Sequence, residues 1–345
     1  MWDKPGTNER KLYCGKVGKP CKLRIFSLEE TLGLIEFRSF NNELQYCSNA
    51  ILSANKYIRK MKGGSQSILV QANDGKYYVV KMAGNPQGAN ILANELLGSL
   101  IAKSVGLPVS EGKGIHLSDS FIDGHPDLWF EVPSGRRRPD TGIHFGSLLV
   151  GQPSGQKRPS EYISPSRINM ITNRDSFLGM YLLDVWANHQ DSRQAILLRK
   201  PNDCTQKAYF IDHGHMFGGP EWNFQERPGS ALHLETTVYS DLWVDEQIAS
   251  WISRFQTVIP EVLSTVAPCI PSQWYNGNLG ELTRRLADRL PLLTELVQTD
   301  AAKSWQLALR KSKDDSLRLS DSGVHNLRTS DTRSSIHRDS AVACA

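Results

Sequence analysis

Two aspartates flank a predicted β-hairpin in the middle of the chain. Residues 194–199 (QAILLR) and 207–211 (KAYFI) are short apolar runs, and the polar connection between them is rich in turn-forming residues. Such runs pair most simply as an antiparallel hairpin, so we expect Asp191, before the first strand, close to Asp212, after the second. One carboxylate can then take a proton while the other holds a divalent cation. The alternative is that both aspartates form or cap turns.

A second predicted hairpin brings glycines beside a lysine. Residues 67–72 and 76–82 are apolar and β-branched, and the Asn-Asp-Gly turn at residues 73–75 joins them. Gly63, Gly64 and Ser65 precede the first strand, and Lys81 ends the second. Glycines let backbone N–H groups approach a phosphate closely, and a lysine adds a positive charge for the same anion. Separately, a Gly-Gly turn and an exposed lysine are most often structural or surface features.

A helix is predicted to follow, with Ile91, Leu92, Leu96, Leu100 and Ile101 at helical spacing. Gly106 and Pro108 end this pattern. Glu95 lies among apolar neighbours, where burial of its charge requires a partner, and Lys81 is the candidate. The alternative is a glutamate at the edge of the apolar stripe that faces water.

The other predicted elements are mostly helical. Residues 175–187 are apolar nearly all round and predict a buried helix that Asn173 or Asp175 can cap, leading into the Asp191 loop. Further helices are expected at residues 240–258 and 279–289. Residues 110–170 appear as loops with brief strand-like pieces, and their run of three arginines, 136–138, suits a solvated face or an acidic ligand.

The composition predicts a globular protein of one two-lobed domain or two smaller ones. The chain has 345 residues, of which 39% are hydrophobic and 22% charged. A formal net charge of +4 gives no argument for direct nucleic-acid binding. The six cysteines form no Cys-x-x-Cys pair, so we expect free thiols in a reducing cytosol. We find no signal peptide or run long enough to span a bilayer, and expect a cytoplasmic protein that binds no membrane.

The order of these parts resembles the HipA-like kinase family of bacterial type. The resemblance covers roughly residues 55–230, and its motifs are KMKGGSQSIL, the block from DGKYYVVK to VGLP, GRRRPDTGIHFGS, LDVWANHQDSRQAILLR and AYFIDHGHMF. It implies an α+β, bilobal protein kinase-like fold with a small β-rich N-lobe and a mostly helical C-lobe. We expect an N-terminal extension at residues 1–54, the N-lobe at 55–110 and the C-lobe at 111–305. Residues 306–345 lack a periodic apolar face and predict a disordered tail.

The resemblance also implies roles for individual residues. Gly63, Gly64, Ser65 and Gln66 would form the phosphate loop. Lys81 would bind ATP phosphates with Glu95 as its partner. Asp191 would orient or deprotonate the acceptor hydroxyl, Asp212 would hold Mg²⁺, and Asn188 would help to hold the Asp191 loop.

One departure concerns the second metal ligand. HipA itself and ordinary protein kinases have an asparagine a few residues after the catalytic aspartate, whereas this chain reads Asp-Ser-Arg-Gln-Ala-Ile from residue 191, a pattern that a subset of the HipA-like proteins shares. Gln194 carries the nearest amide, whose oxygen suits Mg²⁺. Arg193 is a candidate contact for a phosphate or the acceptor.

Three functions follow from this pattern. The first is an ATP-dependent kinase that acts on a protein Ser or Thr, or on itself. The second is a nucleotide-binding pseudokinase that serves as a regulatory module, and the third is a small-molecule kinase. The family resemblance also implies an antitoxin-like protein partner, and the serines of the tail are candidate autophosphorylation sites.

Overall fold

The computed structural model describes residues 51–154, 159–199 and 204–304. All of these described residues belong to one compact unit. The expected N-terminal extension (apart from residues 51–54) and the expected tail therefore lie outside the described residues.

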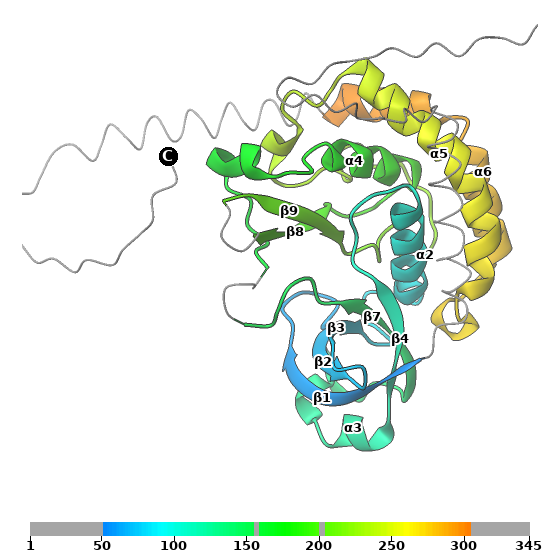
Figure 1. Ribbon diagram of the computed structural model, residues 1–345. Helices are drawn as coiled ribbons and strands as arrows, with labels where there is room; N and C mark the ends of the chain where they lie inside the picture. The colour runs from blue at the N-terminus through cyan, green and yellow to red at the C-terminus, as the bar shows by residue number, and fades with distance from the viewer. Residues whose placement is uncertain (1–50, 155–158, 200–203, 305–345) are drawn as a thin grey trace, which may run out of the picture. The chain divides into compact units, whose positions relative to one another are not determined.

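Five strands close into a barrel in the first part of the described chain (Figure 1). The strand order is β1 (Leu52–Lys60), β2 (Ile68–Ala72), β3 (Tyr77–Lys81), β7 (Gly142–Leu148) and β4 (Gly112–Leu117). Strands β1 and β4 pair in parallel and close the barrel, and the other pairs are antiparallel. The predicted hairpin is β2–β3, and Gly75 in its turn takes a φ of 78°, which favours glycine.

The barrel extends beyond residue 110, where we expected the second lobe to begin. Strands β4 and β7 come from the segment predicted as loops, which also holds α3 (Asp119–Asp123), β5 (Phe130–Val132) and β6 (Gly135–Arg137). Strand β4 reads GKGIHL, and its two glycines weaken the local strand signal. Gly146 in β7 has no room for a side chain, because a Cβ would lie 2.3 Å from Cγ1 of Ile115. Strands β4 and β7 therefore form because they pair with each other and with neighbouring strands of the barrel, and not because of their local sequence.

Helices are the main regular elements in the remaining described part of the chain. They are α2 (Ile91–Ser104), α4 (Ser176–Trp186), α5 (Asp245–Val266) and α6 (Leu279–Arg289), with 3₁₀ turns at Pro126–Leu128, Pro165–Met170, Thr236–Tyr239, Ala267–Cys269 and Ser272–Trp274. All residues of α4 are buried, as its sequence predicts, and α6 has its predicted bounds. Helix α5 begins at Asp245, five residues after the predicted start, and continues through Pro260 to Val266, so it also ends later than predicted.

The central hairpin consists of β8 (Gln194–Arg199) and β9 (Gln206–Ile211) and lies beside α4 (Figure 1). Asp175 occupies the N-cap position of α4, but no side chain caps this helix. The side-chain amide of Asn173 pairs instead with the backbone N–H and C=O of Ala208, at 2.9 and 3.0 Å. Asn173 is therefore not the predicted cap of α4 but connects the segment before this helix to strand β9 of the hairpin.

The prediction of free thiols is wrong for two cysteines. Cys204 and Cys269 are both disulfide-bonded. Sequence spacing does not show which cysteines the fold brings together, and disulfides are typical of oxidising compartments. The cysteines therefore no longer support a cytosolic location. In the described part of the chain, no helix has the length and apolar character needed to cross a bilayer.

His144 is a buried histidine in the barrel with a lowered pKa. His144 is 1% exposed, and its Nδ1 accepts the N–H of Ala83 at 2.8 Å. Burial, with a contribution from His116, lowers the pKa of His144 to about 4. The unfolded chain binds a proton at the usual histidine pKa of about 6.5, so protonation favours unfolding below that pH.

We expect His144 to cost the folded state about 1.4 kcal/mol per pH unit between about pH 6.5 and 4. Urea unfolding at several pH values measures this slope. His144→Asn keeps an acceptor for the N–H of Ala83 but has no group that titrates. The free energy of unfolding of this variant should therefore fall less steeply as the pH is lowered from about 6.5 to 4. Parallel pH dependences of the two proteins would contradict the assignment.

Candidate active site

Lys81 joins the barrel to the helical part of the chain. It is the last residue of β3 and is 8% exposed. Its Nζ donates to Oε1 of Glu95 in α2 and, at 2.6 Å, to Oδ1 of Asp212 after β9. Burial alone would lower the pKa of Lys81, but the two carboxylates outweigh it and raise the pKa. The expected pairing of Lys81 with Glu95 is present, and Asp212 is added to it.

Glu95 also holds the backbone that follows Asp212. It is 3% exposed, and its two carboxylate oxygens accept the N–H groups of His213 (3.1 Å) and Gly214 (2.9 Å). A Cβ on Gly214 would lie 3.1 Å from Oε1 of Glu95, so glycine permits this close approach. Burial raises the pKa of Glu95, and the ammonium of Lys81 opposes that shift. The alternative of a water-facing Glu95 does not hold.

Asp212 adopts a left-handed backbone conformation, with a φ of 64°. Its Oδ2 accepts the side-chain amide of Gln194 at 2.8 Å, so the two predicted metal ligands are adjacent. Burial would raise the pKa of Asp212, but Lys81 and Arg193 outweigh it and lower the pKa well below its usual range. The carboxylate is therefore ionised over the physiological pH range.

Arg193 does not reach an acceptor or a phosphate, contrary to our prediction. It is 1% exposed, and its guanidinium pairs with both carboxylate oxygens of Asp184, which is 0% exposed, at 2.8 and 2.5 Å. Its Nη1 donates to the backbone carbonyls of Ile211 (2.7 Å) and Asp212 (3.0 Å). Arg193 is thus a buried positioning residue.

Two buried charged residues, Arg193 and Glu95, bind the backbone on the two sides of Asp212. Arg193 donates to the carbonyls before and at Asp212, and Glu95 accepts the two N–H groups after it. A non-glycine residue with positive φ persists where its surroundings fix it. These four backbone contacts fix the direction of the Asp212 carboxylate.

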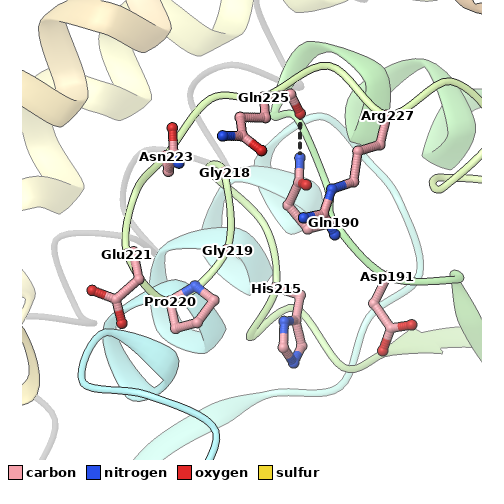
Figure 2. A pocket seen from close by; sticks show the side chains of 10 residues that line it. All are labelled: Gln190, Asp191, His215, Gly218, Gly219, Pro220, Glu221, Asn223, Gln225 and Arg227. Carbon is pink, nitrogen blue, oxygen red and sulfur yellow. Dashed lines mark hydrogen bonds between the residues drawn. The ribbon is translucent and has the colours of Figure 1, made fainter.

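Asp191 lies at a pocket of about 430 Å³ (Figure 2). The carboxylate is exposed, and its Oδ1 accepts the N–H of Ser192 at 2.7 Å. Asn188, expected to hold this loop, has a φ of 52° and accepts the amide of Gln190 at its Oδ1, 2.6 Å away. The same amide donates to the carbonyl of Gln225 at 2.9 Å, so this hydrogen bond ties the loop to another residue that lines the pocket.

The predicted phosphate loop is held by neighbouring segments. Gly63 has a φ of 118°, which favours glycine. The amide of Gln66 pairs with the backbone N–H and C=O of Glu131, both at 2.7 Å, so this side chain is structural. The amide of Asn85 donates to the carbonyl of Ser65 at 3.0 Å, and a Cβ on Gly64 would lie 3.1 Å from Nε2 of Gln87. The loop therefore offers backbone rather than the Gln66 amide to a ligand.

Sequence reasoning missed two buried polar residues that support the site. Asp184 is a charged residue on a helix that is apolar all round, so a buried cation was needed to neutralise it. Asn94 is 0% exposed; its amide donates to the carbonyls of Gly214, Met216 and Gly219, and its Oδ1 accepts the indole N–H of Trp222. The argument that we applied to Glu95 would have found both residues.

The donor set suits a divalent cation only in part. The described residues contain no group of three or more His, Cys, Asp or Glu side chains able to hold a metal ion. Asp212 and Gln194 supply one carboxylate and one amide. Mg²⁺ is commonly bound by one or two carboxylates together with substrate phosphates, so this pair fits a metal that arrives with a nucleotide.

The Asp184–Arg193 pair gives a test of stability with a matched control. Asp184→Asn leaves a buried guanidinium without its counter-ion and should lower the free energy of unfolding by about 3–5 kcal/mol. Asp288→Asn removes a partner of Arg284 from an exposed pair and should cost at most about 1 kcal/mol. Urea denaturation measures both, and equal costs would contradict the role of the buried pair.

Comparison with known proteins identifies the family of this chain. The family model described as HipA-like kinase matches residues 55–307. The search of curated proteins finds no match. Among solved structures, the chain is similar to the Golgi casein kinase (12% identity, TM-score 0.46, covering 78% of each chain). It is also similar to the Helicobacter pylori proinflammatory kinase CtkA (14% identity, TM-score 0.47, covering 72% of this chain and 96% of that one). Because the family model covers most of the chain, the protein belongs to the HipA-like kinase family.

Proposed function

We propose that the protein transfers the γ-phosphoryl group of ATP to a serine or threonine hydroxyl of a protein. The observation that carries this proposal is the buried contact of Lys81 with both Glu95 and Asp212. It places a fixed ammonium beside a carboxylate that stays ionised, within the fold of a kinase family. Phosphoryl transfer depends mostly on such positioning and on charge neutralisation.

Each charged residue has a separate task in this proposal. Lys81 exchanges its contact with Asp212 for the phosphates of ATP, and Glu95 keeps the ammonium in place. Asp212 and Gln194 would hold Mg²⁺, which supplies charge neutralisation at the phosphates when it is bound. The backbone of Gly63, Gly64 and Ser65 would cradle the phosphates.

Asp191 is the residue proposed to orient the acceptor hydroxyl and take its proton. Its exposed carboxylate borders the pocket, whereas Asp212 is tied to Lys81. A general base must reach the proton that it removes, and Asp191 is the accessible carboxylate of the two. In this proposal Asp191 takes the proton and Asp212 binds the metal.

A pseudokinase is the second candidate, favoured by one contact. Gln194 replaces the expected asparagine, and its amide already donates to Asp212. A site in which this contact persists would bind nucleotide without turning it over. A small-molecule kinase would differ from the proposed protein kinase only in its acceptor. The identity of the acceptor that becomes labelled therefore distinguishes these two functions.

Nucleotide binding and turnover separate these functions. ATP with Mg²⁺ should raise the melting temperature of the protein by mass action, and Asp212→Asn should abolish the part that depends on Mg²⁺. Asp191→Asn should keep this rise but slow phosphorylation of a Ser/Thr peptide library by about 10²–10⁴-fold. Asp288→Asn serves as the control.

Binding without transfer to any peptide or small hydroxyl compound would favour the pseudokinase. Undiminished transfer by Asp191→Asn would show that another group removes the proton.

A further inference from the structure

The pocket beside Asp191 carries unpaired charges of both signs. Arg227 and Glu221 line it, and among the described residues neither side chain has an ion-pair or hydrogen-bond partner. Figure 2 shows Arg227 with Asp191 at one side of the pocket and Glu221 at the other, with His215 between them. Pro220 supplies the one apolar side chain among the ten lining residues. Such a lining suits a hydrophilic occupant with a cation and an anion some distance apart.

The rim of this pocket is fixed before anything binds. Asn94 holds the carbonyls of Met216 and Gly219, and Gly218 donates to the carbonyl of Asn188 at 3.0 Å. A Cβ on Gly218 would meet the backbone of Asn223 at 2.6 Å. Preorganisation of this kind lowers the entropic cost of binding.

The pocket also adjoins the predicted phosphate loop. A Cβ on Gly88 would lie 2.3 Å from Cβ of Pro220, so the segment after β3 packs directly against the pocket rim. One residue earlier, Gln87 lies beside Gly64. An acceptor in the pocket would therefore lie next to the segment proposed to hold the phosphates.

The last described residue, Ser304, lies beside Gly229, two residues from the pocket-lining Arg227. Gly229, two residues after Arg227, would place a Cβ 3.4 Å from Oγ of Ser304, the last residue described. The N–H of Gly229 donates to Asp300 at 3.0 Å. The sequence after residue 304 thus starts close to the Arg227 side of the pocket. Ser320 and Ser330 follow 16 and 26 residues later. An extended chain spans about 3.3 Å per residue, so both are within reach.

That sequence repeats one charge pattern around a serine. Residues 317–321 read Leu-Arg-Leu-Ser-Asp, and residues 327–331 read Leu-Arg-Thr-Ser-Asp. In both, an arginine stands two residues before the serine and an aspartate directly after it. No other serine of the chain has this arrangement with aspartate. The pattern complements a pocket with Glu221 at one side and Arg227 at the other.

We propose that this pocket binds the protein's own C-terminal segment and that Ser320 and Ser330 are phosphorylated there. Arg318 or Arg328 would face Glu221, and Asp321 or Asp331 would face Arg227. The serine oxygen forms the new bond to the γ-phosphorus of ATP, the bond to the β-phosphate oxygen breaks, ADP leaves, and Asp191 takes the hydroxyl proton. The inference rests on the proposed kinase function and names its acceptor.

Ser160 provides an internal comparison. It too has an arginine two residues before it and an acidic residue, Glu161, directly after it. However, its backbone N–H and C=O both pair with Leu197, at 3.0 and 2.7 Å. This segment is held at the edge of β8, so Ser160 should not enter the pocket.

Phosphopeptide mass spectrometry tests the sites in the full chain. After incubation with ATP and Mg²⁺, phosphate is expected at Ser320 and Ser330 and not at Ser160, Ser316 or Ser322. The double variant Ser320→Ala/Ser330→Ala should lose most of the incorporated phosphate.

A charge swap tests the pocket with peptides of residues 314–324 as acceptors. Arg227→Glu should lower kcat/KM for the native peptide at least about tenfold, since like charges then face each other. The same variant should recover activity on a peptide in which Asp321 is replaced by Lys. Glu221→Lys should likewise lower kcat/KM for the native peptide and recover activity on a peptide in which Arg318 is replaced by Glu. The control variant is Glu261→Lys, at an exposed position on α5, which should leave the activity on all three peptides unchanged.

Other outcomes would overturn the proposal in distinguishable ways. Labelling of a general Ser/Thr peptide library without labelling of Ser320 or Ser330 would reject the acceptor and leave the kinase function standing. Labelled tail serines with no response to either charge swap would reject the pocket. Absence of transfer to every peptide would reject the kinase function, and this inference with it.

Discussion

The contact of Lys81 with Glu95 and Asp212 is the interaction on which the rest of the site depends. It connects β3 of the barrel, helix α2 and the turn after β9, three segments far apart in the sequence. Loss of the Lys81 ammonium would leave the carboxylates of Glu95 and Asp212 without the counter-ion that they share. The geometry of the site is therefore coupled to the packing of the barrel against the helical part of the chain.

Helix α2 supports both halves of the proposed chemistry through adjacent residues. Glu95 holds Lys81 and the Asp212 turn, while Asn94 holds the loop that forms the pocket beside Asp191. Because both side chains are buried and hydrogen-bonded, a shift of α2 would displace the Asp212 turn and the pocket beside Asp191 together. Arg193 completes this support from the hairpin, since it links Asp184 in α4 to the carbonyls at Asp212.

The departure at Gln194 is compatible with the rest of the geometry. Its side chain lies beside Asp212 and shares the end of the hairpin with it. The longer side chain therefore lies where the proposed second Mg²⁺ ligand would be, and its amide oxygen remains available when the amide nitrogen donates to Asp212. As a proposed ligand, glutamine differs from asparagine in the length of its side chain and not in the amide group that it presents.

The sequence by itself determined both hairpins and the buried helix α4, because local patterns specify them. It offered Lys81 as the candidate partner of Glu95, because a buried charge needs a counter-charge, and left a water-facing Glu95 as the alternative. It also identified the family, through motifs that keep their order along the chain. The tertiary structure decided what depends on distant partners: that β4 and β7 complete the barrel, that Arg193 is buried against Asp184, and that Gln66 binds the backbone of Glu131. A glycine-rich strand or an arginine in a loop has no fixed role until a neighbour from elsewhere in the chain supplies its hydrogen bonds or its counter-charge.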